Sequence, residues 1–403
     1  MPAARARHIP ALLDIHAEDL AFLWSQRREA LGSRKHTLRE YAELNERIEA
    51  HLQGLLIAPP DTLVAMMQPR LAAPDRDEVF AAAYALLRLD ERQSTHLVVI
   101  EFSRATGATL AGLRDAFSVA PHALFAAEMQ SALDKSKPTT AISAAVVLAN
   151  QRLLDAQSPR LTALLEDADD AVCELAWRTA ALVDAARRLP EPNRRFNHCL
   201  AHAAPAVRSA GWATAAWSAQ APALPLLRHF VGKGDAVALH WLAVLGNAED
   251  CALLHQSALA LDDAATHCEL LARYGHPSSI DLLLPMMEGA DLALAAAAGQ
   301  AFTRITGVDI QGRRTTLPVS DDADDFERDM APDIWLPDVV KARAAVERHG
   351  ARWAEGSRWC CGHRIDIEIG RDLLAQLDLE ARWDCAARAA MAGRPVSAPR
   401  PIH

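Results

Sequence analysis

The feature that most constrains this chain is a helical pattern that recurs about every 30 residues. Its plainest copy is Asp291–Gly307, which has an acidic start, a face of small side chains and a closing glycine. Related starts lie 28 to 35 residues apart, at Asp170, Pro205, Asp235, Asp263 and Asp291. Repeated units of this length, each pairing a first helix with this Ala-rich second helix, are typical of a solenoid, in which every unit buries its apolar face on its neighbours.

The repeat divides the chain into four segments and predicts an all-α fold, an α-solenoid of helical pairs with irregular N- and C-terminal caps. Residues 61–307 carry the repeat array. Residues 1–60 hold two helices with a different apolar spacing, and residues 308–392 lose the repeat, so we expect both segments to cap the ends of the solenoid. Residues 393–403 contain Pro395, Pro399 and Pro401 and are expected to form a flexible tail.

The same context decides the local structure of ambiguous segments. Leu97–Ala105 contains β-branched residues, yet its place among helical pairs favours a helix. Val308–Pro337 includes the acidic stretch Asp321–Asp329, which lacks the glycine and closing glutamate of an EF-hand, so we expect a solvated loop, with docking to a basic partner as the alternative. Gly350–Gly362 should fold against the last units, and a final helix is expected at about Asp372–Met391.

Charge and composition exclude several classes of partner. The formal net charge of −10 argues against a surface built to bind nucleic acid. The seven cysteines are scattered and show no CxxC pair, which is typical of reduced thiols packed in a cytoplasmic protein. The apolar runs are too short for a signal peptide or a membrane helix. We therefore expect a cytoplasmic protein that does not insert into membranes.

No motif in the sequence indicates catalysis. GxSxG, the P-loop, GxGxxG and HExxH are all absent. His16 and Glu18 with His51 on the next helix have the residue types of an acid–base pair, but a polar lock between the first two helices is the favoured interpretation. The sequence therefore predicts a protein that is not an enzyme, with no catalytic residue and no cofactor.

One group of residues has the chemistry of metal ligands. Cys360, Cys361 and His363 stand within four positions of the chain. Adjacent cysteines do not have the separation of structural zinc pairs, and no second CxxC or HxxxH lies nearby. We therefore predict no metal site and interpret the thiols as packed with Trp353 and Trp359.

A row of aromatic and basic residues is the candidate binding site. Tryptophans recur in or near the second helices of successive units, and tryptophan and arginine are common in interface hot spots. The inner row of a solenoid is where partners bind. The hypothesis is a protein-binding face, with core packing of the tryptophans as the alternative, and it comprises Trp177, Arg178, Arg208, Trp212, Trp217 and Trp241.

Stretches near both ends of the chain resemble a known family. They are HAEDLAFLWSQR at His16–Arg27 with LNERIEAHLQGL at Leu44–Leu55, AFTRITGVDI at Ala301–Ile310, and WLPDVVKA at Trp335–Ala342 with the piece that follows to Arg364. They are similar to a bacterial family of HEAT-like repeat proteins, whose repeat is named after phycobilin lyases. The resemblance spans nearly the whole chain. It implies HEAT-like helical pairs, but a shared repeat shape does not transfer the lyase reaction.

The resemblance also implies a cellular role. Members of that family are often encoded beside type VI secretion genes, and no catalytic residue is known in them. The implied function is a non-enzymatic protein-binding scaffold, an accessory adaptor or chaperone for a secretion effector or spike component. An immunity protein that masks a toxin is the alternative, followed by an enzyme with an unrecognised site.

Overall fold

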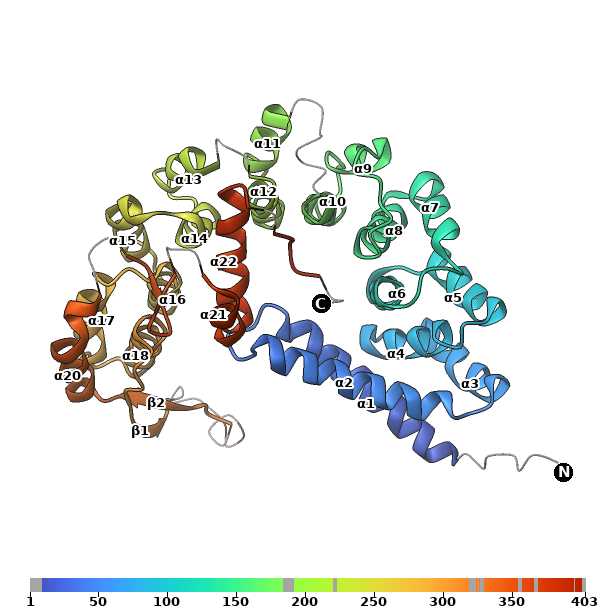
Figure 1. Ribbon diagram of the computed structural model, residues 1–403, viewed down its shortest axis with the longest axis horizontal. Helices are drawn as coiled ribbons and strands as arrows, with labels where there is room; N and C mark the ends of the chain where they lie inside the picture. The colour runs from blue at the N-terminus through green and yellow to red at the C-terminus, as the bar shows by residue number, and fades with distance from the viewer. Residues whose placement is uncertain are drawn as a thin grey trace. The chain divides into compact units, whose positions relative to one another are not determined.

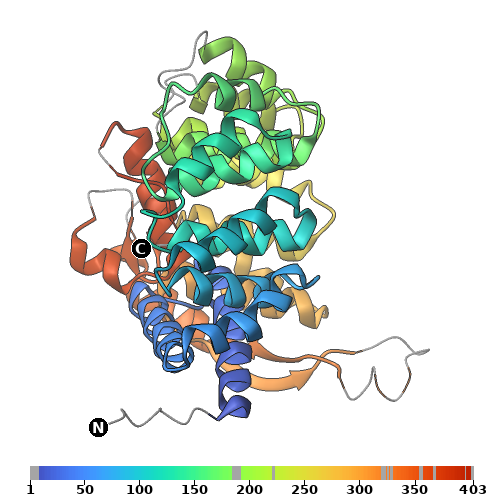
Figure 2. The same cartoon turned by 90° about the vertical axis from the view of Figure 1, so that its right-hand side faces the viewer.

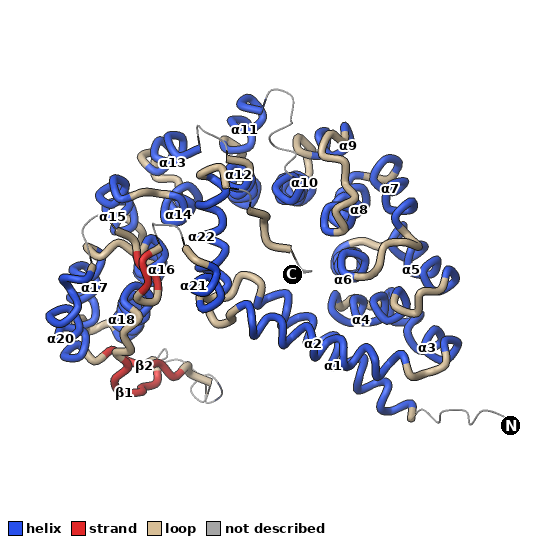
Figure 3. Tube along the Cα trace, viewed as in Figure 1, coloured by secondary structure: helices blue, strands red, loops and turns tan. Residues whose placement is uncertain are grey.

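The computed structural model describes residues 9–183, 192–219, 223–318, 324, 326, 330–353, 357–365, 369–394 and 396–400 (Figure 1). These residues are mostly helical with little sheet, which confirms the all-α class (Figure 3). By contacts the chain forms two compact units. Unit 1 is Met1–Gln220 with Ala375–His403, and unit 2 is Ala221–Leu374. This division by contacts differs from the division by repeat pattern, which places boundaries at residues 60, 307 and 392.

Unit 1 is built from helices that pack in chain order in two layers (Figure 1). In the first layer each helix packs on the next, and its members are α1 (Pro10–Ala30), α4 (Arg76–Leu87), α6 (Gly107–Val119), α8 (Pro138–Asn150), α10 (Asp170–Val183) and α12 (Pro205–Trp217). The second layer covers them with α2 (Leu38–Leu56), α3 (Pro60–Met67), the 3-10 turn η1 (Gln68–Ala72), α5 (Arg92–Arg104), α7 (Ala126–Lys135), α9 (Pro159–Leu164) and α11 (Pro192–Leu200). The helix at α5 confirms the prediction made for residues 97–105.

Small side chains allow the first layer of unit 1 to pack closely. Most residues of α4 and α8 are buried, and alanine is the commonest among them. At Gly112 of α6 a Cβ atom would collide with the carbonyl oxygen of Arg76, so only glycine permits this approach of α6 to the start of α4. Because small side chains fill the interface between α4 and its neighbours, the stability of that interface depends on these short distances between helices.

The C-terminal part of unit 1 is bound to the loop between α1 and α2, residues 31–37 (Figure 2). Helix α22 (Leu379–Met391) also contacts α12. The indole N–H of Trp383 donates to the Leu31 carbonyl at 2.7 Å, and the backbone N–H of Leu379 donates to the backbone carbonyl of His36 at 2.8 Å. In the expected flexible tail, Arg400 is 8% exposed and donates to the carbonyl of Leu182 at 2.6 Å. This part of the tail is therefore packed in the structure.

Unit 2 repeats the same helical scheme and adds strands. Helices α14 (Ala236–Leu245), α16 (Ala264–Tyr274) and α18 (Leu292–Thr306) pack in succession. They are covered by α13 (Ala223–Val231), η3 (Ala248–Asp250), α15 (Cys251–Leu259) and α17 (Ser279–Met287). The chain continues with β1 (Gln311–Thr316), β2 (Asp333–Pro337), α20 (Val339–His349), η4 (Gly350–Arg352), β3 (Trp359–Cys360), β4 (His363–Arg364) and α21 (Arg371–Gln376).

The helix ends follow the sequence signals closely. The carboxylates of Asp235, Asp263 and Asp291 each accept backbone N–H groups in the first turn of the next helix. Gly275 and Gly307 close their helices at a φ of 70°, in the left-handed region that favours glycine. One start is shifted: Asp169, and not Asp170, accepts the backbone N–H groups at the start of α10.

Two local predictions for the C-terminal region are wrong. The expected loop at residues 308–337 contains the antiparallel pair β1–β2, whose strands find their partners only in the tertiary structure. The expected helix at residues 372–391 is two helices, because Asp378 caps α22 and so begins a new helix there. The acidic stretch Asp321–Asp329 lies outside the described residues, except for Asp324 and Phe326.

Residues 357–362 fold against the last helices of unit 2, as the sequence predicts. The backbone N–H of Trp359 donates to the carbonyl of Gly275 at 2.7 Å, and the backbone N–H of Gly362 donates to the carbonyl of Ile305 at 3.1 Å. The side chain of Arg358 is 2% exposed and donates to carbonyls at the C-terminal ends of α14 and α16. Segment 357–362 therefore satisfies helix ends that would otherwise have no partners.

Candidate functional site

The structure removes two residues from the hypothesised aromatic row. Trp177 and Trp212 are each 1% exposed, so in this structure their rings are core and not surface. The indole nitrogen of Trp177 donates to the Leu165 carbonyl at 3.2 Å, and its ring lies 5.0 Å from that of Phe196. The prediction of surface exposure is wrong for these two residues because they lie on the helix face that packs on the neighbouring helical pair. The spacing of apolar residues does not distinguish that face from an open concave face.

The other residues of the row have different environments. Arg178 is exposed and pairs with Glu174 at 2.8 Å. Arg208 donates to two carbonyls of the preceding loop, and Trp217 is half-buried. Trp241 is half-buried in unit 2, whereas the others belong to unit 1. A role of these four residues in protein binding stays a prediction.

The polar groups singled out in the sequence make local contacts in the structure. Nδ1 of His16 lies 3.2 Å from Nδ1 of His51, so the two side chains connect α1 and α2 as the polar lock predicts. Cys360 is buried and Cys361 exposed, with their sulfur atoms 3.9 Å apart at the turn between β3 and β4, and His363 is half-buried in β4. The backbone of this turn is bound to the end of α18 through Cys361 and Gly362.

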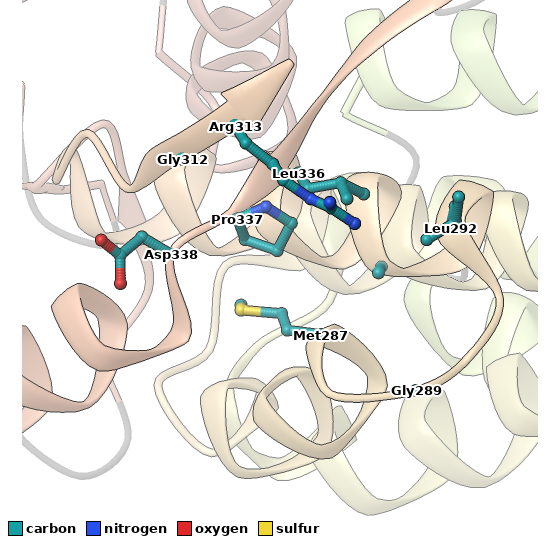
Figure 4. A pocket seen from close by; sticks show the side chains of 9 residues that line it. Met287, Gly289, Leu292, Gly312, Arg313, Leu336, Pro337 and Asp338 are labelled. Atoms are coloured by element: carbon teal, nitrogen blue, oxygen red, sulfur yellow. The ribbon is translucent and has the colours of Figure 1, made fainter. Parts of the chain in front are cut away.

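A groove in unit 2 is the most developed candidate site (Figure 4). It has a volume of about 410 Å³ and lies between the α17–α18 turn and the β1–β2 pair. Met287, Ala295 and Leu336 are buried at its base, at 5%, 3% and 8% exposure. Gly299 of α18 faces Pro337, where a Cβ atom would come within 2.8 Å of the proline ring, so glycine lets the strands lie close to the helix. The result is an apolar floor with strand backbone along one side.

A β-bulge directs one side chain over this groove. Gln311 is opposite Pro337 and Arg314 is opposite Trp335, so Gly312 and Arg313 together face Leu336 alone. An extra residue of this kind bends a strand and reorients its side chain, and bulges are common beside functional sites. Arg313 extends over the groove and ends beside Leu336 (Figure 4). The bulge thus places a cation above an apolar floor.

The charges at the groove are unequal. Within the described part of the chain, the guanidinium of Arg313 has no hydrogen-bond or ion-pair partner. Asp338, at the other end of the groove, is occupied as the cap of α20, where it accepts from the backbone N–H of Lys341 at 3.0 Å. The free charge at this groove is therefore positive, although the whole chain is acidic.

The elements that form the groove also carry exposed apolar side chains outside its lining, and they include open strand edges. Trp335 of β2 is 48% exposed and Val340 of α20 is 79% exposed. The pair β1–β2 forms a two-stranded sheet, and among the described residues neither strand pairs with a third. An open strand edge is a template for an extended peptide, which adds to it through main-chain hydrogen bonds. The sequence does not indicate this site, although the end motif WLPDVVKA contains Trp335, Leu336 and Asp338.

A second polar cluster in unit 2 lies between α15 and the start of α17. The sulfur of Cys251 is 3.4 Å from Nδ1 of His276 and 3.2 Å from Oγ of Ser278, and Nε2 of His255 is 2.9 Å from Oγ of Ser279. Burial raises the pKa of the Cys251 thiol. Burial, together with the neighbouring histidines, lowers the pKa of His255 to about 4. Cys251 is therefore a neutral thiol and His255 a neutral imidazole at pH 7, so the cluster does not contain an activated Cys251 thiolate.

Comparison with known proteins adds no family or function. No protein-family model matches the chain, and no curated protein matches it. No helix in the described part of the chain combines the length and apolar character needed to cross a bilayer.

Proposed function

We propose that this chain is a non-enzymatic protein-binding scaffold whose units are built from HEAT-like helical pairs. Support for the helical pairs comes from the two-layered, chain-order packing within each unit. The proposed docking site is the groove between the α17–α18 turn and β1–β2. One observation carries it: Arg313, which has no partner among the described residues, lies over an apolar floor beside a strand edge to which no described strand is paired.

The groove fits an extended segment of a protein partner. The main chain of that segment adds to an edge of the β1–β2 pair, one apolar side chain fills the floor, and a nearby carboxylate pairs with Arg313. Arginine suits this role because its planar fork matches a carboxylate with two hydrogen bonds. The volume of about 410 Å³ is within the range of ligand sites and accommodates side chains, not a folded domain.

The test is a change of charge preference. Peptides selected from a random display library on the immobilised full chain should be rich in Asp or Glu next to a large apolar residue. The Arg313→Glu variant should lose these peptides by about tenfold in affinity or more and select Lys or Arg instead. Arg314→Glu is the matched control, because Arg314 is the next residue of β1 and pairs with Asp333 at 2.8 Å. Selection without acidic enrichment, or an unchanged preference in Arg313→Glu, would contradict the proposal.

We further propose that the partner is a type VI secretion effector or spike component, with the chain as its adaptor or chaperone. Support comes from the family resemblance at the two ends of the chain. Pull-down from the native host should recover such a partner with the wild type and with Arg314→Glu, and lose it with Arg313→Glu. Deletion of an adaptor should block delivery without harming the producing cell, whereas deletion of an immunity protein should be toxic only when its toxin is present.

A further inference from the structure

A cavity in unit 1 contains a buried arginine, Arg27, that pairs with no carboxylate among the described residues. The cavity has a volume of about 280 Å³, and its lining comes from α1, α2, α4 and α6: Trp24, Arg27, Asn45, Ile48, Phe80, Tyr84 and Val119. Arg27 is 2% exposed. Its Nε is buried without a partner, and within the described part of the chain the guanidinium has neither a hydrogen-bond acceptor nor a carboxylate partner.

Aromatic rings hold this guanidinium in place. Its central carbon lies 4.5 Å from the centre of the Tyr41 ring and 5.3 Å from that of Trp24. Trp24 in turn stacks on Phe80, with ring centres 3.8 Å apart and planes 8° from parallel. The faces of aromatic rings attract a cation but accept no ordinary hydrogen bond, so the N–H donors of Arg27 remain available.

Two carboxylates lie near the cavity, and each forms an ion pair with an arginine other than Arg27. Asp115, which accepts from Trp24, pairs with Arg76 at 2.7 Å. Glu49 receives two hydrogen bonds from Arg88, which also contacts Tyr84. Arg27 therefore gains no counter-ion from these neighbouring side chains.

The phenols beside Arg27 do not supply the missing charge either. Burial raises the pKa of both Tyr41 and Tyr84 above the ordinary value of 10.0, although Arg27 and Arg88 oppose that shift. Burial lowers the pKa of Arg27, but an arginine keeps its proton in proteins. The cavity thus contains a fixed positive charge beside aromatic and aliphatic side chains and the polar side chain of Asn45.

From this arrangement we infer that the cavity binds a small monocarboxylate with a flat or branched apolar body. A planar carboxylate matches the guanidinium fork with two charge-assisted hydrogen bonds. One cation balances one negative charge, which favours a carboxylate over a phosphate dianion. Phe80, Ile48 and Val119 offer the apolar walls that the body of such a ligand needs. The site is in unit 1 and is independent of the groove proposed for protein binding.

Benzoate and its neutral isostere benzamide are the probes for a calorimetric and ligand-observed NMR titration of the full chain. Benzoate should bind at least tenfold more tightly than benzamide. Arg27→Met should lose benzoate binding by at least tenfold while keeping the wild-type circular dichroism spectrum. Arg28→Met is the matched control, because Arg28 pairs with Asp77 at 3.3 Å outside the cavity lining, and it should bind benzoate like the wild type.

A second variant keeps the test independent of the folding of Arg27→Met. Val119→Trp fills the cavity from the half-buried end of α6 and leaves Arg27 intact, so it should also abolish benzoate binding. Short peptides ending in phenylalanine, as free acid and as amide, distinguish a free small molecule from a chain terminus as the source of the carboxylate. Equal binding of benzoate and benzamide, or undiminished binding in Arg27→Met or Val119→Trp, would overturn the inference.

Discussion

Replacing Arg358 by methionine should destabilise unit 2 by about 4 kcal/mol. The side chain is 2% exposed, and its three nitrogens donate to five carbonyls at 2.6–3.2 Å. The acceptors belong to Ala243, Val244, Gly246, Arg273 and Tyr274. They are carbonyls at the ends of two helices, where the helix dipole also favours a cation.

The magnitude follows from opposing contributions at Arg358. Hydrogen bonds from a charged donor contribute about 1.5–3 kcal/mol each, so the five bonds are substantial together. The cost of burying the guanidinium offsets several kcal/mol of that sum. Removal of one partner of a buried charged interaction is typically destabilising by about 3–5 kcal/mol, because the remaining groups lose their partners. Arg358→Lys keeps the charge with only three donors, and we expect about half the loss.

Urea unfolding and hydrogen exchange of the full chain measure this effect. In Arg358→Met, the amides of α14 and α16 should exchange faster, and the unfolding transition of unit 2 should shift to lower urea concentration. Arg352→Met is the matched control, since Arg352 is exposed and lies 5.9 Å from the Trp359 ring without entering the helix ends. A loss below about 1 kcal/mol in Arg358→Met, with unchanged exchange of both helices, would refute the reasoning.

Three further predictions address packing and titration. Trp177→Ala should destabilise unit 1 by about 3–5 kcal/mol, as for a buried aromatic residue; thermal unfolding measures it, and a loss below 1 kcal/mol would return Trp177 to the binding row. Gly112→Ala should cost about 1–3 kcal/mol by forcing α6 from α4, and unchanged urea unfolding would contradict the close contact. Because the pKa of folded His255 is lowered to about 4 from 6.5, its stabilising contribution is complete above pH 6.5 and is lost as the pH falls toward 4. The full shift corresponds to about 3 kcal/mol, but the imidazole is only partly buried and solvent screens it, so His255→Gln should flatten the stability–pH curve between these values by about 1–2 kcal/mol. A curve identical to the wild type would show that His255 does not titrate in this way.

Local signals were sufficient to predict the second helices of unit 2. At Asp263 and Asp291 a carboxylate precedes the helix, and at Gly275 and Gly307 a glycine ends it. These signals act over a few residues, so they are visible without the fold. Strands β1 and β2 were missed because their pairing joins residues about twenty positions apart, and the sequence QGRRTT has no alternating apolar face.

The candidate site could be predicted only in part. The motif containing Trp335 and Leu336 is recognisable in the chain, but the bulge that places Arg313 over the groove depends on the register between two strands. A shift of one residue in that register would turn the side chain to the opposite face. The hypothesised tryptophan row failed at Trp177 and Trp212 for a related reason, since the packing of neighbouring pairs decides which helix face is covered.

Three arginines show why residue type alone does not indicate function in this chain. Arg358 donates to carbonyls 84 to 115 positions away, so its role is structural and depends on the folding of two distant helices. Arg27 is equally buried but has neither carbonyl nor carboxylate partners, and Arg313 is exposed and unpaired within the described residues. A buried guanidinium whose N–H donors all have acceptors in the protein has no donor free to bind a ligand. A buried guanidinium without such acceptors favours a ligand that supplies them. Donors with no acceptor in the described part of the chain, buried at Arg27 and open to solvent at Arg313, are therefore the property by which the two proposed sites differ from the structural arginine.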